Sequence, residues 1–243
     1  KYRRVHLPPY QFRQDRCWLS PKPGTAEPGC TPFYTMQWEQ ELYAGQYRAV
    51  VDGATLIFRK SHSLGIELKK LVSSKKSRVM EVVFDSDQQS GSDSKDTFYM
   101  ARDPGFSDWN ALKAWINSVD ITQVIHATAL FDYGKPKSKT QLEQHLQDGV
   151  LNALQALQVV LEGRENNKMQ VVFITNYADQ VDESEIHLYP ENAAVHGLAN
   201  CLRWEHAAVD CLCIDVDETT TAADIVDELL GDKNHSFAAY RGN

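Results

Sequence analysis

The sequence lacks a glycine-rich turn where its first strand-and-helix pattern would need one to bind a nucleotide. Residues 54–58 form a short apolar run typical of a buried parallel strand. Apolar residues then recur at helical spacing at Leu64, Leu68, Leu71 and Val72. In a dinucleotide-binding strand–turn–helix, glycines let the backbone approach a pyrophosphate at the helix N-terminus. Here Arg59, Lys60 and His62 occupy the turn, and only Gly65 remains, where helix and strand would pack closely. We therefore expect the scaffold to be retained and the cofactor site to be lost.

A basic face and long apolar runs are also lacking. The chain of 243 residues has 25 Lys and Arg against 33 Asp and Glu, a formal net charge of −8. This balance argues against binding to nucleic acid or to an anionic membrane. No apolar run approaches the roughly 20 residues of a membrane span, and the N-terminus has no signal-peptide pattern. We expect a cytoplasmic protein without nucleic-acid or membrane partners.

Cysteines are sparse and odd in number, which disfavours a disulfide framework. The five are Cys17, Cys30, Cys201, Cys211 and Cys213. The last two alternate with Leu212 and Ile214 as in a buried strand, so we interpret them as reduced core thiols. No second Cys/His pair has metal-ligand spacing, and we expect no metal site.

Sequence motifs for the common hydrolases and phosphate-binding loops are absent as well. There is no Gly-x-Ser-x-Gly elbow, His-Glu-x-x-His pair or Walker loop. Four carboxylates, Asp179, Asp182, Glu183 and Glu185, share one segment, which we interpret as a solvated loop.

What the sequence does contain is a regular alternation of strand and helix patterns. The expected strands are 54–58, 78–84, 97–100, 121–129, 169–175, 210–216 and 237–240. The expected helices are 64–72, 107–118, 140–161, 190–207 and 221–230. This alternation predicts an α/β fold with a doubly wound, mainly parallel sheet. At this length, the chain can form one large core or one domain with appendages.

Some details of the helices follow from local signals. Ser107 or Asp108 is the expected N-cap of the second helix, and Thr140 with Glu143 fits a capping box at the start of residues 140–161. That third helix carries an apolar stripe at Leu142, Leu146, Val150, Ala153, Leu154, Leu157 and Leu161. Residues 85–96 are polar throughout, and we expect a mobile surface loop there.

The first 39 residues differ in character from the rest. Residues 1–19 interleave arginines with Tyr2, Tyr10, Phe12 and Trp18, which suits an extended segment lying on a neighbouring surface. The alternative is a strip for single-stranded nucleic acid, which the overall charge disfavours. Residues 20–32 are rich in proline and glycine and indicate a linker, and residues 33–39 alternate as in a half-buried strand.

The N-terminal segments resemble a known family. Residues 5–19 resemble the segment that follows the acyltransferase in modular polyketide synthases, with Cys17 where that family usually has Tyr. Tyr34 and Trp38 fit the Tyr-x-x-x-Trp strand that opens the ketoreductase region of these synthases. The resemblance implies a domain order of post-acyltransferase linker 1–19, Pro/Gly linker 20–32 and ketoreductase-like domain 33–243.

Later motifs resemble short-chain dehydrogenases/reductases, but with the chemistry altered. His126-Ala127-Thr128-Ala129 parallels a His-Ala-Ala-Gly-like turn, and Gly149, Asn152 and Ala156 fit a Gly-x-x-Asn-x-x-x-Ala helix. The expected catalytic Ser is replaced in the turn 175–178, and His196 stands where the family has Tyr. His196 could donate a proton, but it lacks a Lys partner at helical spacing. We therefore expect it to pack or to lie at the surface.

The last third of the chain resembles the structural half of polyketide synthase ketoreductases. The matching stretches are 196–200, Glu205-His206, 211–217 and 239–242, with His196, Ala199, Asn200 and Ala207 departing from the family pattern. The resemblance implies a degenerate, truncated Rossmann-like half with no catalytic, cofactor-binding or metal-binding residues. Its implied partners are the catalytic ketoreductase half and the upstream ketosynthase and acyltransferase of the same polypeptide, with an acyl carrier protein involved indirectly.

Two other functions stay open at this point. One is an active NAD(P)H-dependent short-chain reductase with an atypical site, and the other is a free-standing, non-enzymatic binding protein of the same fold. An active reductase would need a glycine turn and a Tyr/Lys pair.

Overall fold

The computed structural model describes residues 38–40, 53–75, 78–84, 90–131, 138–164, 166–182, 185, 187–231 and 235–242. The chain divides into two compact units, Lys1–Glu41 and Leu42–Asn243. In the first unit, residues 38–40 carry neither helix nor strand. The predicted segments 1–19 and 20–32, and most of the predicted strand 33–39, lie outside the described residues.

The second unit is built on one eight-stranded sheet in the order β3-β4-β2-β1-β5-β6-β7-β8. The strands are β1 (Ala54–Arg59), β2 (Arg78–Phe84), β3 (Gly91–Ser92), β4 (Thr97–Met100), β5 (Ile121–Ala129), β6 (Met169–Asn176), β7 (Val209–Val216) and β8 (Phe237–Ala239). All neighbouring pairs are parallel except β3 with β4. The predicted α/β class and the mainly parallel, doubly wound sheet are confirmed.

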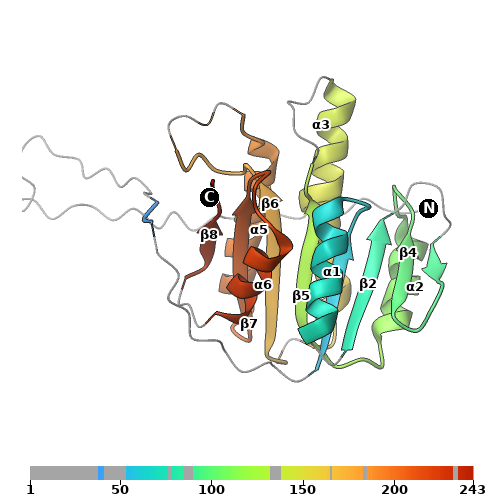
Figure 1. Ribbon diagram of the computed structural model, residues 1–243. Coiled ribbons are helices and arrows are strands. Elements are labelled where there is room, and N and C mark those ends of the chain that lie inside the picture. Colours follow the sequence, from blue (N-terminus) through green and yellow to red (C-terminus); the bar gives the residue numbers. More distant parts are fainter. Residues whose placement is uncertain are drawn as a thin grey trace, which may run out of the picture. The chain divides into compact units, whose positions relative to one another are not determined.

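Helices cover both faces of this sheet (Figure 1). They are α1 (Ser63–Lys75), α2 (Phe106–Ile116), α3 (Lys139–Leu146), the π-helical turn η1 (Gln147–Leu151), α4 (Asn152–Leu161), α5 (Pro190–Glu205) and α6 (Ala222–Leu230). α1 and α6 pack side by side on one face, and α2, α4 and α5 lie on the other. Among the described residues, none of these helices is both long and apolar enough to cross a membrane.

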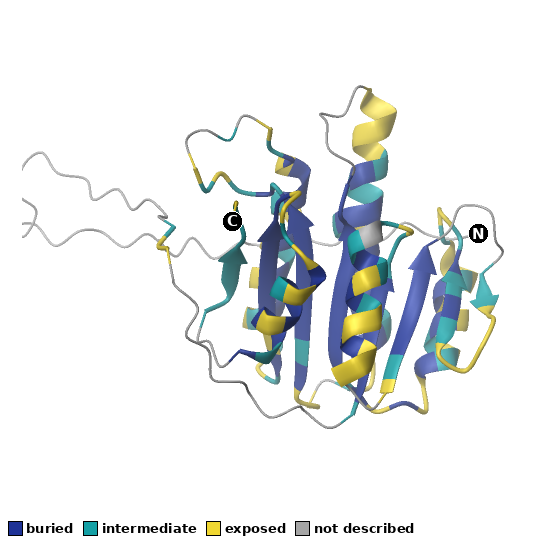
Figure 2. Ribbon diagram, viewed as in Figure 1, coloured by how far each residue is buried: buried dark blue, intermediate teal, exposed yellow. Residues whose placement is uncertain are grey.

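The sheet is buried on both sides, as the near-continuous apolar strands require. Leu56 and Phe58 of β1 join the core under α2, α4 and α5, and Ile57 between them joins the core under α1 and α6. Figure 2 shows the consequence: the central strands are dark blue along most of their length. Cys211 and Cys213 are buried in β7 as free thiols, as predicted.

The helix predicted over residues 140–161 is present as a continuous helical segment over residues 139–161, and it differs from the prediction in two respects. It begins one residue earlier, with the side chain of Ser138 as N-cap accepting from the Gln141 backbone N–H, so the Thr140/Glu143 capping box does not form. Its middle is the π-helical turn η1, where each turn holds an extra residue. Ala153, Leu157 and Leu161 of the predicted stripe are buried, but Leu154 is 41% exposed.

Other local predictions also need correction. Gly105, not Ser107 or Asp108, caps α2, because the Asp108 carboxylate accepts from the Gly105 backbone N–H at 2.7 Å. The polar run 85–96 contains the strand β3, and residues 85–89 lie outside the described part. Leu71 and Leu142 were placed on the apolar stripes of their helices, but both are exposed.

Candidate functional site

In a doubly wound sheet, ligands bind at the carboxyl ends of the strands where the strand order reverses. Here that point lies between β1 and β5, because the chain runs from β1 toward β2 on one side and returns to β5 on the other. The turn 60–62 after β1 and the residues after β5 border this position. We therefore take this position as the candidate site, and we call it the crevice after its counterpart in other doubly wound sheets.

An ion pair joins the two sides of the crevice. Lys60 Nζ, after β1, lies 2.5 Å from Asp148 Oδ2 in η1, the turn that follows β5 along the chain. Asp148 Oδ1 also accepts from Gln144 Nε2 at 3.0 Å, and its side chain is only 4% exposed. The Asp148 backbone carbonyl accepts from the Thr128 hydroxyl at the end of β5. This ion pair therefore links the turn after β1 to the helical segment after β5.

A second ion-pair cluster lies beside β1 and is centred on Glu81. Arg59 Nε donates to Glu81 Oε2 of β2 at 2.7 Å, and both side chains are largely buried. Lys69 of α1 lies 3.3 Å from the other Glu81 oxygen, which also accepts from the Thr97 hydroxyl. The carboxylate of Glu81 is therefore satisfied by three neighbouring elements.

The single remaining glycine of the turn is less constrained than predicted. A Cβ on Gly65 would lie 3.5 Å from the Cβ of Arg59, an ordinary van der Waals contact. Gly65 does pack on the end of β1, but alanine would fit there.

His126 is a core residue of β5. It is 2% exposed and lies between the rings of Phe58 and Phe173, each about 6.0 Å away between centroids. Burial lowers the pKa of His126 to about 3, so the imidazole stays neutral. Its Nε2 lies 3.1 Å from the Thr128 hydroxyl, which supplies a polar partner.

His196 takes part in a buried hydrogen-bond chain at the carboxyl end of β6. Its Nε2 lies 3.1 Å from the hydroxyl of Thr175, and its Nδ1 lies 2.9 Å from Asp179 Oδ2. Thr175 in turn donates to Asp215 Oδ1 of β7 at 2.8 Å. The hydrogen bond with His196 lowers the pKa of Asp179. Thr175 is fully buried and His196 is 6% exposed.

The strongest polar centre was missed by the sequence reasoning. Arg241 donates to Asp215 Oδ2 at 2.6 Å, to the Asp179 carbonyl at 3.1 Å and to Glu185. Burial opposes its charge, but Asp215 and Glu185 outweigh that effect and raise the pKa of Arg241. Its guanidinium also stacks over the Tyr177 ring at 4.9 Å.

The acidic segment 179–185 is therefore not simply a solvated loop, contrary to the prediction. Asp179 pairs with His196, and Glu185 is about one-tenth exposed and paired with Arg241. No sequence pattern links Arg241 to partners 26 to 62 residues earlier in the chain.

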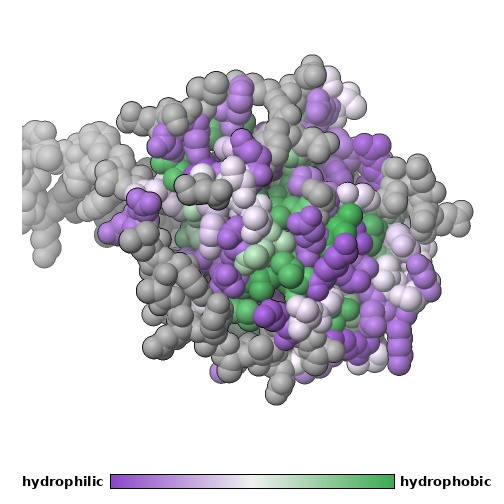
Figure 3. Space-filling model, in the orientation of Figure 1, coloured by the Kyte–Doolittle hydropathy of each residue, from purple (hydrophilic) through white to green (hydrophobic). Residues whose placement is uncertain are grey.

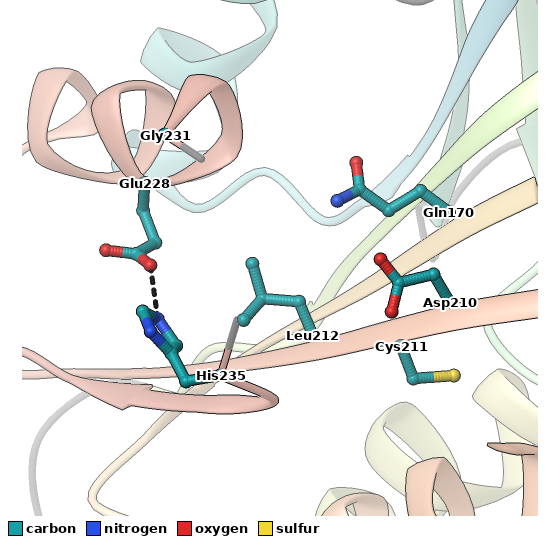
Figure 4. A pocket seen from close by; sticks show the side chains of 7 residues that line it. All are labelled: Gln170, Asp210, Cys211, Leu212, Glu228, Gly231 and His235. Atoms are coloured by element: carbon teal, nitrogen blue, oxygen red, sulfur yellow. Dashed lines mark hydrogen bonds and ion pairs between the residues drawn. The ribbon is translucent and has the colours of Figure 1, made fainter. Parts of the chain in front are cut away.

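A small polar hollow lies at the opposite, amino-terminal edge of the sheet (Figure 4). It is lined by Gln170, Asp210, Cys211, Leu212, Glu228, Gly231 and His235. The buried Glu228 carboxylate is already satisfied by His235 Nε2 at 2.6 Å and by the Tyr240 hydroxyl at 2.5 Å. Figure 4 shows the Cys211 side chain pointing away from Glu228 and His235. Across the described part of the chain, no three His, Cys, Asp or Glu side chains are grouped as metal ligands would be.

Comparison with known proteins places this architecture among the reductase folds. No protein-family model matches the chain, and no curated protein matches its sequence. Among solved structures, the ketoreductase-containing structure of a keto acid-selecting NRPS module, with adenylation and pseudo Asub domains, matches 83% of this chain at a TM-score of 0.70 and 20% identity. An N-terminal ketoreductase from the macrolactin assembly line matches 82% at a TM-score of 0.62 and 16% identity.

The chain spans only 17% and 40% of those two proteins. A short-chain dehydrogenase/reductase from Vibrio parahaemolyticus, by contrast, is covered over its whole length, with 78% of this chain, a TM-score of 0.58 and 18% identity. At these identities the likeness is one of fold. The chain has a ketoreductase-like, short-chain dehydrogenase/reductase fold.

Proposed function

We propose that this chain is the non-catalytic structural half of a polyketide synthase ketoreductase. In this role it packs on a separate catalytic half, stabilises it and positions it within the synthase module. The chain itself catalyses no reaction, and none of its residues binds a cofactor or a metal. Its partners are that catalytic half and the upstream ketosynthase and acyltransferase of the same polypeptide, with an acyl carrier protein served indirectly.

The observation that carries this proposal is the ion pair between Lys60 and Asp148 across the crevice. A nicotinamide cofactor needs close backbone approach at the turn after β1. The turn offers Lys60 and His62 in place of glycines, and its lysine is held by a buried carboxylate from the other side. The site residues therefore do not fit a dinucleotide.

The state of the would-be catalytic positions supports the same conclusion. Reduction of a carbonyl needs a proton donor that reaches the substrate oxygen. Thr175 and His196 stand at the matching positions, but both are buried and engaged with Asp215 and Asp179. Neither has a lysine among its hydrogen-bond partners.

The domain order of the proposal rests on the sequence resemblance. Residues 1–19 are the post-acyltransferase linker, 20–32 a Pro/Gly linker and 33–243 the structural half. The similarity of the fold to two ketoreductase-containing proteins is consistent with this order.

Calorimetric titration of the chain with NADPH and NADH tests the proposal against an active reductase. We expect no binding up to millimolar cofactor, with an active short-chain reductase titrated in parallel as the positive control. A micromolar dissociation constant for either cofactor would favour the active NAD(P)H-dependent reductase instead.

A further inference from the structure

The hydrogen-bond chain through His196 restricts where its protons can be. The chain runs from Asp179 to His196 and Thr175 at the carboxyl end of β6, and it continues to Asp215 of β7. A hydroxyl has one proton to donate, an ionised carboxylate has none, and each ring nitrogen of an imidazole either donates or accepts. Counting these protons gives the charge of the buried ring.

The proton of the Thr175 hydroxyl is donated to Asp215. The two oxygens lie 2.8 Å apart, and the Asp215 carboxylate also accepts from the Ala178 backbone N–H at 2.9 Å and from Arg241 at 2.6 Å. With three donors around it, Asp215 is an ionised acceptor and has no proton to give. The Thr175 oxygen therefore accepts from His196 Nε2, and this nitrogen carries a proton.

The other ring nitrogen of His196 carries a proton as well. Nδ1 lies 2.9 Å from Asp179 Oδ2, and the hydrogen bond lowers the pKa of the Asp179 carboxyl, so this acid is ionised and accepts. Protons on both nitrogens make the imidazole of His196 a cation. The side chain is only 8% exposed, so hydrogen bonds and neighbouring carboxylates hold the charge.

The charged groups around His196 favour a cation at this position. They are Asp179 after β6, Asp215 and the Cys213 thiol in β7, Arg203 in α5, and Arg241 after β8 with its partner Glu185. Burial raises the pKa of Cys213, so the thiol is neutral. Arg203 lies over the Phe237 ring, which contacts the His196 ring edge-on. In this group three carboxylates face two arginines, and a protonated His196 balances the third.

Loss of one ring proton would break one of the two hydrogen bonds of His196, and burial decides which. If Nε2 lost its proton, Thr175 would have to turn its hydroxyl away from Asp215, which is 1% exposed. If Nδ1 lost its proton, the ring would present a lone pair to Asp179, whose side chain is 30% exposed and can turn to water. Depriving a buried acceptor of its donor is the more costly outcome. The Nδ1 proton is therefore the one that leaves.

We propose that His196 is a pH-dependent latch on the segment that follows β6, residues 177–182. With both ring nitrogens protonated, the imidazole holds Asp179 and the latch is closed. With Nδ1 deprotonated, the ring keeps its bond to Thr175, Asp179 turns into solvent and the latch is open. Figure 3 shows mainly hydrophilic residues at the carboxyl end of the sheet, at the top of the view, where a released carboxylate would be hydrated. The latch operates in the fold itself, whether or not the chain is the structural half of a ketoreductase.

Opening of the latch is confined to this segment. Histidine is the side chain whose charge changes between about pH 5 and pH 8, whereas an arginine and an ionised aspartate keep their charges there. The Asp179 carbonyl accepts from Arg241 at 3.1 Å, and the Ala178 N–H donates to Asp215, in both states of the ring. These bonds hold the start of the segment while the Asp179 side chain is released.

Nitrogen-15 NMR of the histidine rings of this chain tests the latch directly. Contacts between the ring protons of His196 and Phe237, whose centroids are 5.4 Å apart, assign the signals without a substitution. We expect both ring nitrogens of His196 to carry protons at about pH 6, and Nε2 alone at about pH 8. A ring that is neutral at the lower pH, still charged at the higher pH, or protonated on Nδ1 alone would overturn the proposal.

Amide hydrogen exchange connects the ring to the segment. Protection factors for residues 177–182, which correct for the effect of pH on intrinsic exchange, should fall by about threefold or more between the two pH values. Asp179→Asn should abolish this fall, because an amide can accept from a protonated Nδ1 and donate to a deprotonated one. His206→Gln is the matched control: it removes the histidine at the C-cap of the same helix and should leave the fall unchanged.

The outcomes are independent of the proposed function. Constant protection in the parent chain, or the same fall in Asp179→Asn as in the parent, would overturn the latch and leave the structural-half proposal standing. Cofactor binding by this chain would overturn the structural half and leave the latch standing. If Asp179→Asn does not fold, the ring nitrogens of the parent chain still decide.

Discussion

At the scale of single residues, Arg241 connects several groups at the carboxyl end of the sheet. It bonds the carboxylates of Asp215 and Glu185 and the backbone carbonyl of Asp179. Asp215 has a side-chain exposure of 1%, and Arg241 supplies the positive charge that faces it. Both the positive charge of Arg241 and the planar geometry of its guanidinium contribute to these contacts.

Arg241→Ala should therefore lower the free energy of unfolding by about 3–5 kcal/mol, the usual cost of stranding a buried charge. Arg241→Lys should recover part of the loss, because the charge returns without the two-pronged geometry. Urea unfolding followed by circular dichroism measures both. A loss below about 1 kcal/mol for the alanine variant, within the range of surface ion pairs, would contradict the role assigned to Arg241.

Asp179 is expected to make the free energy of unfolding depend on pH in the acidic range. Its pKa is lowered chiefly by the hydrogen bond with His196, so the folded state holds this proton less tightly than the unfolded state. The contribution is present above the unfolded pKa of about 3.9 and is lost as the pH falls through the folded value. We expect the free energy of unfolding to fall as the pH drops below about 5, and to fall less steeply in Asp179→Asn.

Unfolding titrations in urea at several pH values would measure this slope. Asp217 has a lowered pKa too, because hydrogen bonds from Gly242, Thr219 and Thr220 outweigh the effect of burial. Part of the slope should therefore remain in Asp179→Asn. Identical slopes for the parent chain and the variant would show that Asp179 is not the group involved.

At the level of residues, the sequence predicted the burial of side chains that follows from local pattern. It did not predict the burial of side chains that depends on partners distant in the chain. The alternation around Cys211 and Cys213 was enough to predict their burial. The buried bonds of Glu185 and Asp179 were not predictable, because their partners lie far along the chain and only the folded sheet brings them together.

At the scale of elements, substitutions at two glycines are expected to change stability in opposite directions. Gly53, just before β1, has φ +114°, and a Cβ there would lie 2.5 Å from Thr122 Cγ2 of β5. Gly197 is in the middle of α5 with open space around it. Position 53 therefore requires glycine. At position 197 glycine is not required, and it makes the helix less stable than alanine would.

Gly53→Ala should destabilise the chain by about 1–3 kcal/mol, from strain and the close contact. Gly197→Ala should stabilise it by about 0.5–1 kcal/mol, the helix-propensity gain. Thermal unfolding of the two variants beside the parent chain gives the comparison. Shifts of the same sign for both would contradict the backbone assignment at one of these positions.

The limits of the strands were predicted more accurately than the irregularity inside the long helix. The strands 78–84, 97–100 and 121–129 were predicted with the observed limits. The turn η1 was not predictable, because a leucine stripe of ordinary period gives no sign of an inserted residue.

At the scale of the whole molecule, the alternation of strands and helices was sufficient to predict the sheet. Parallel strands joined through helices can be connected in few ways, since such crossovers are right-handed. The turn after β1 was singled out in advance because it lacks glycine, and the loss of a cofactor site there stays a prediction. The Lys60–Asp148 pair was not predicted, because it joins two segments 88 residues apart.

The order of strands predicts a gradient of local stability across the sheet. β1, β5 and β6 are central, and most of their residues are buried, whereas β3 and β8 are short and lie at the edges. Amide hydrogen exchange should be slowest in the three central strands and fastest in the two edge strands. Exchange in β5 as fast as in β8 would contradict the central, doubly covered position of β5.

The ion pair across the crevice also makes the order of substitutions matter. Loss of Lys60 first would strand Asp148, whose side chain is 4% exposed, whereas loss of Asp148 first would leave a lysine that is one-third exposed and able to reach water. Substitutions that remove both side chains are therefore expected to be tolerated better in one order, with Asp148 replaced before Lys60. A series that begins with Lys60 passes through a variant in which the buried Asp148 carboxylate has lost its cation.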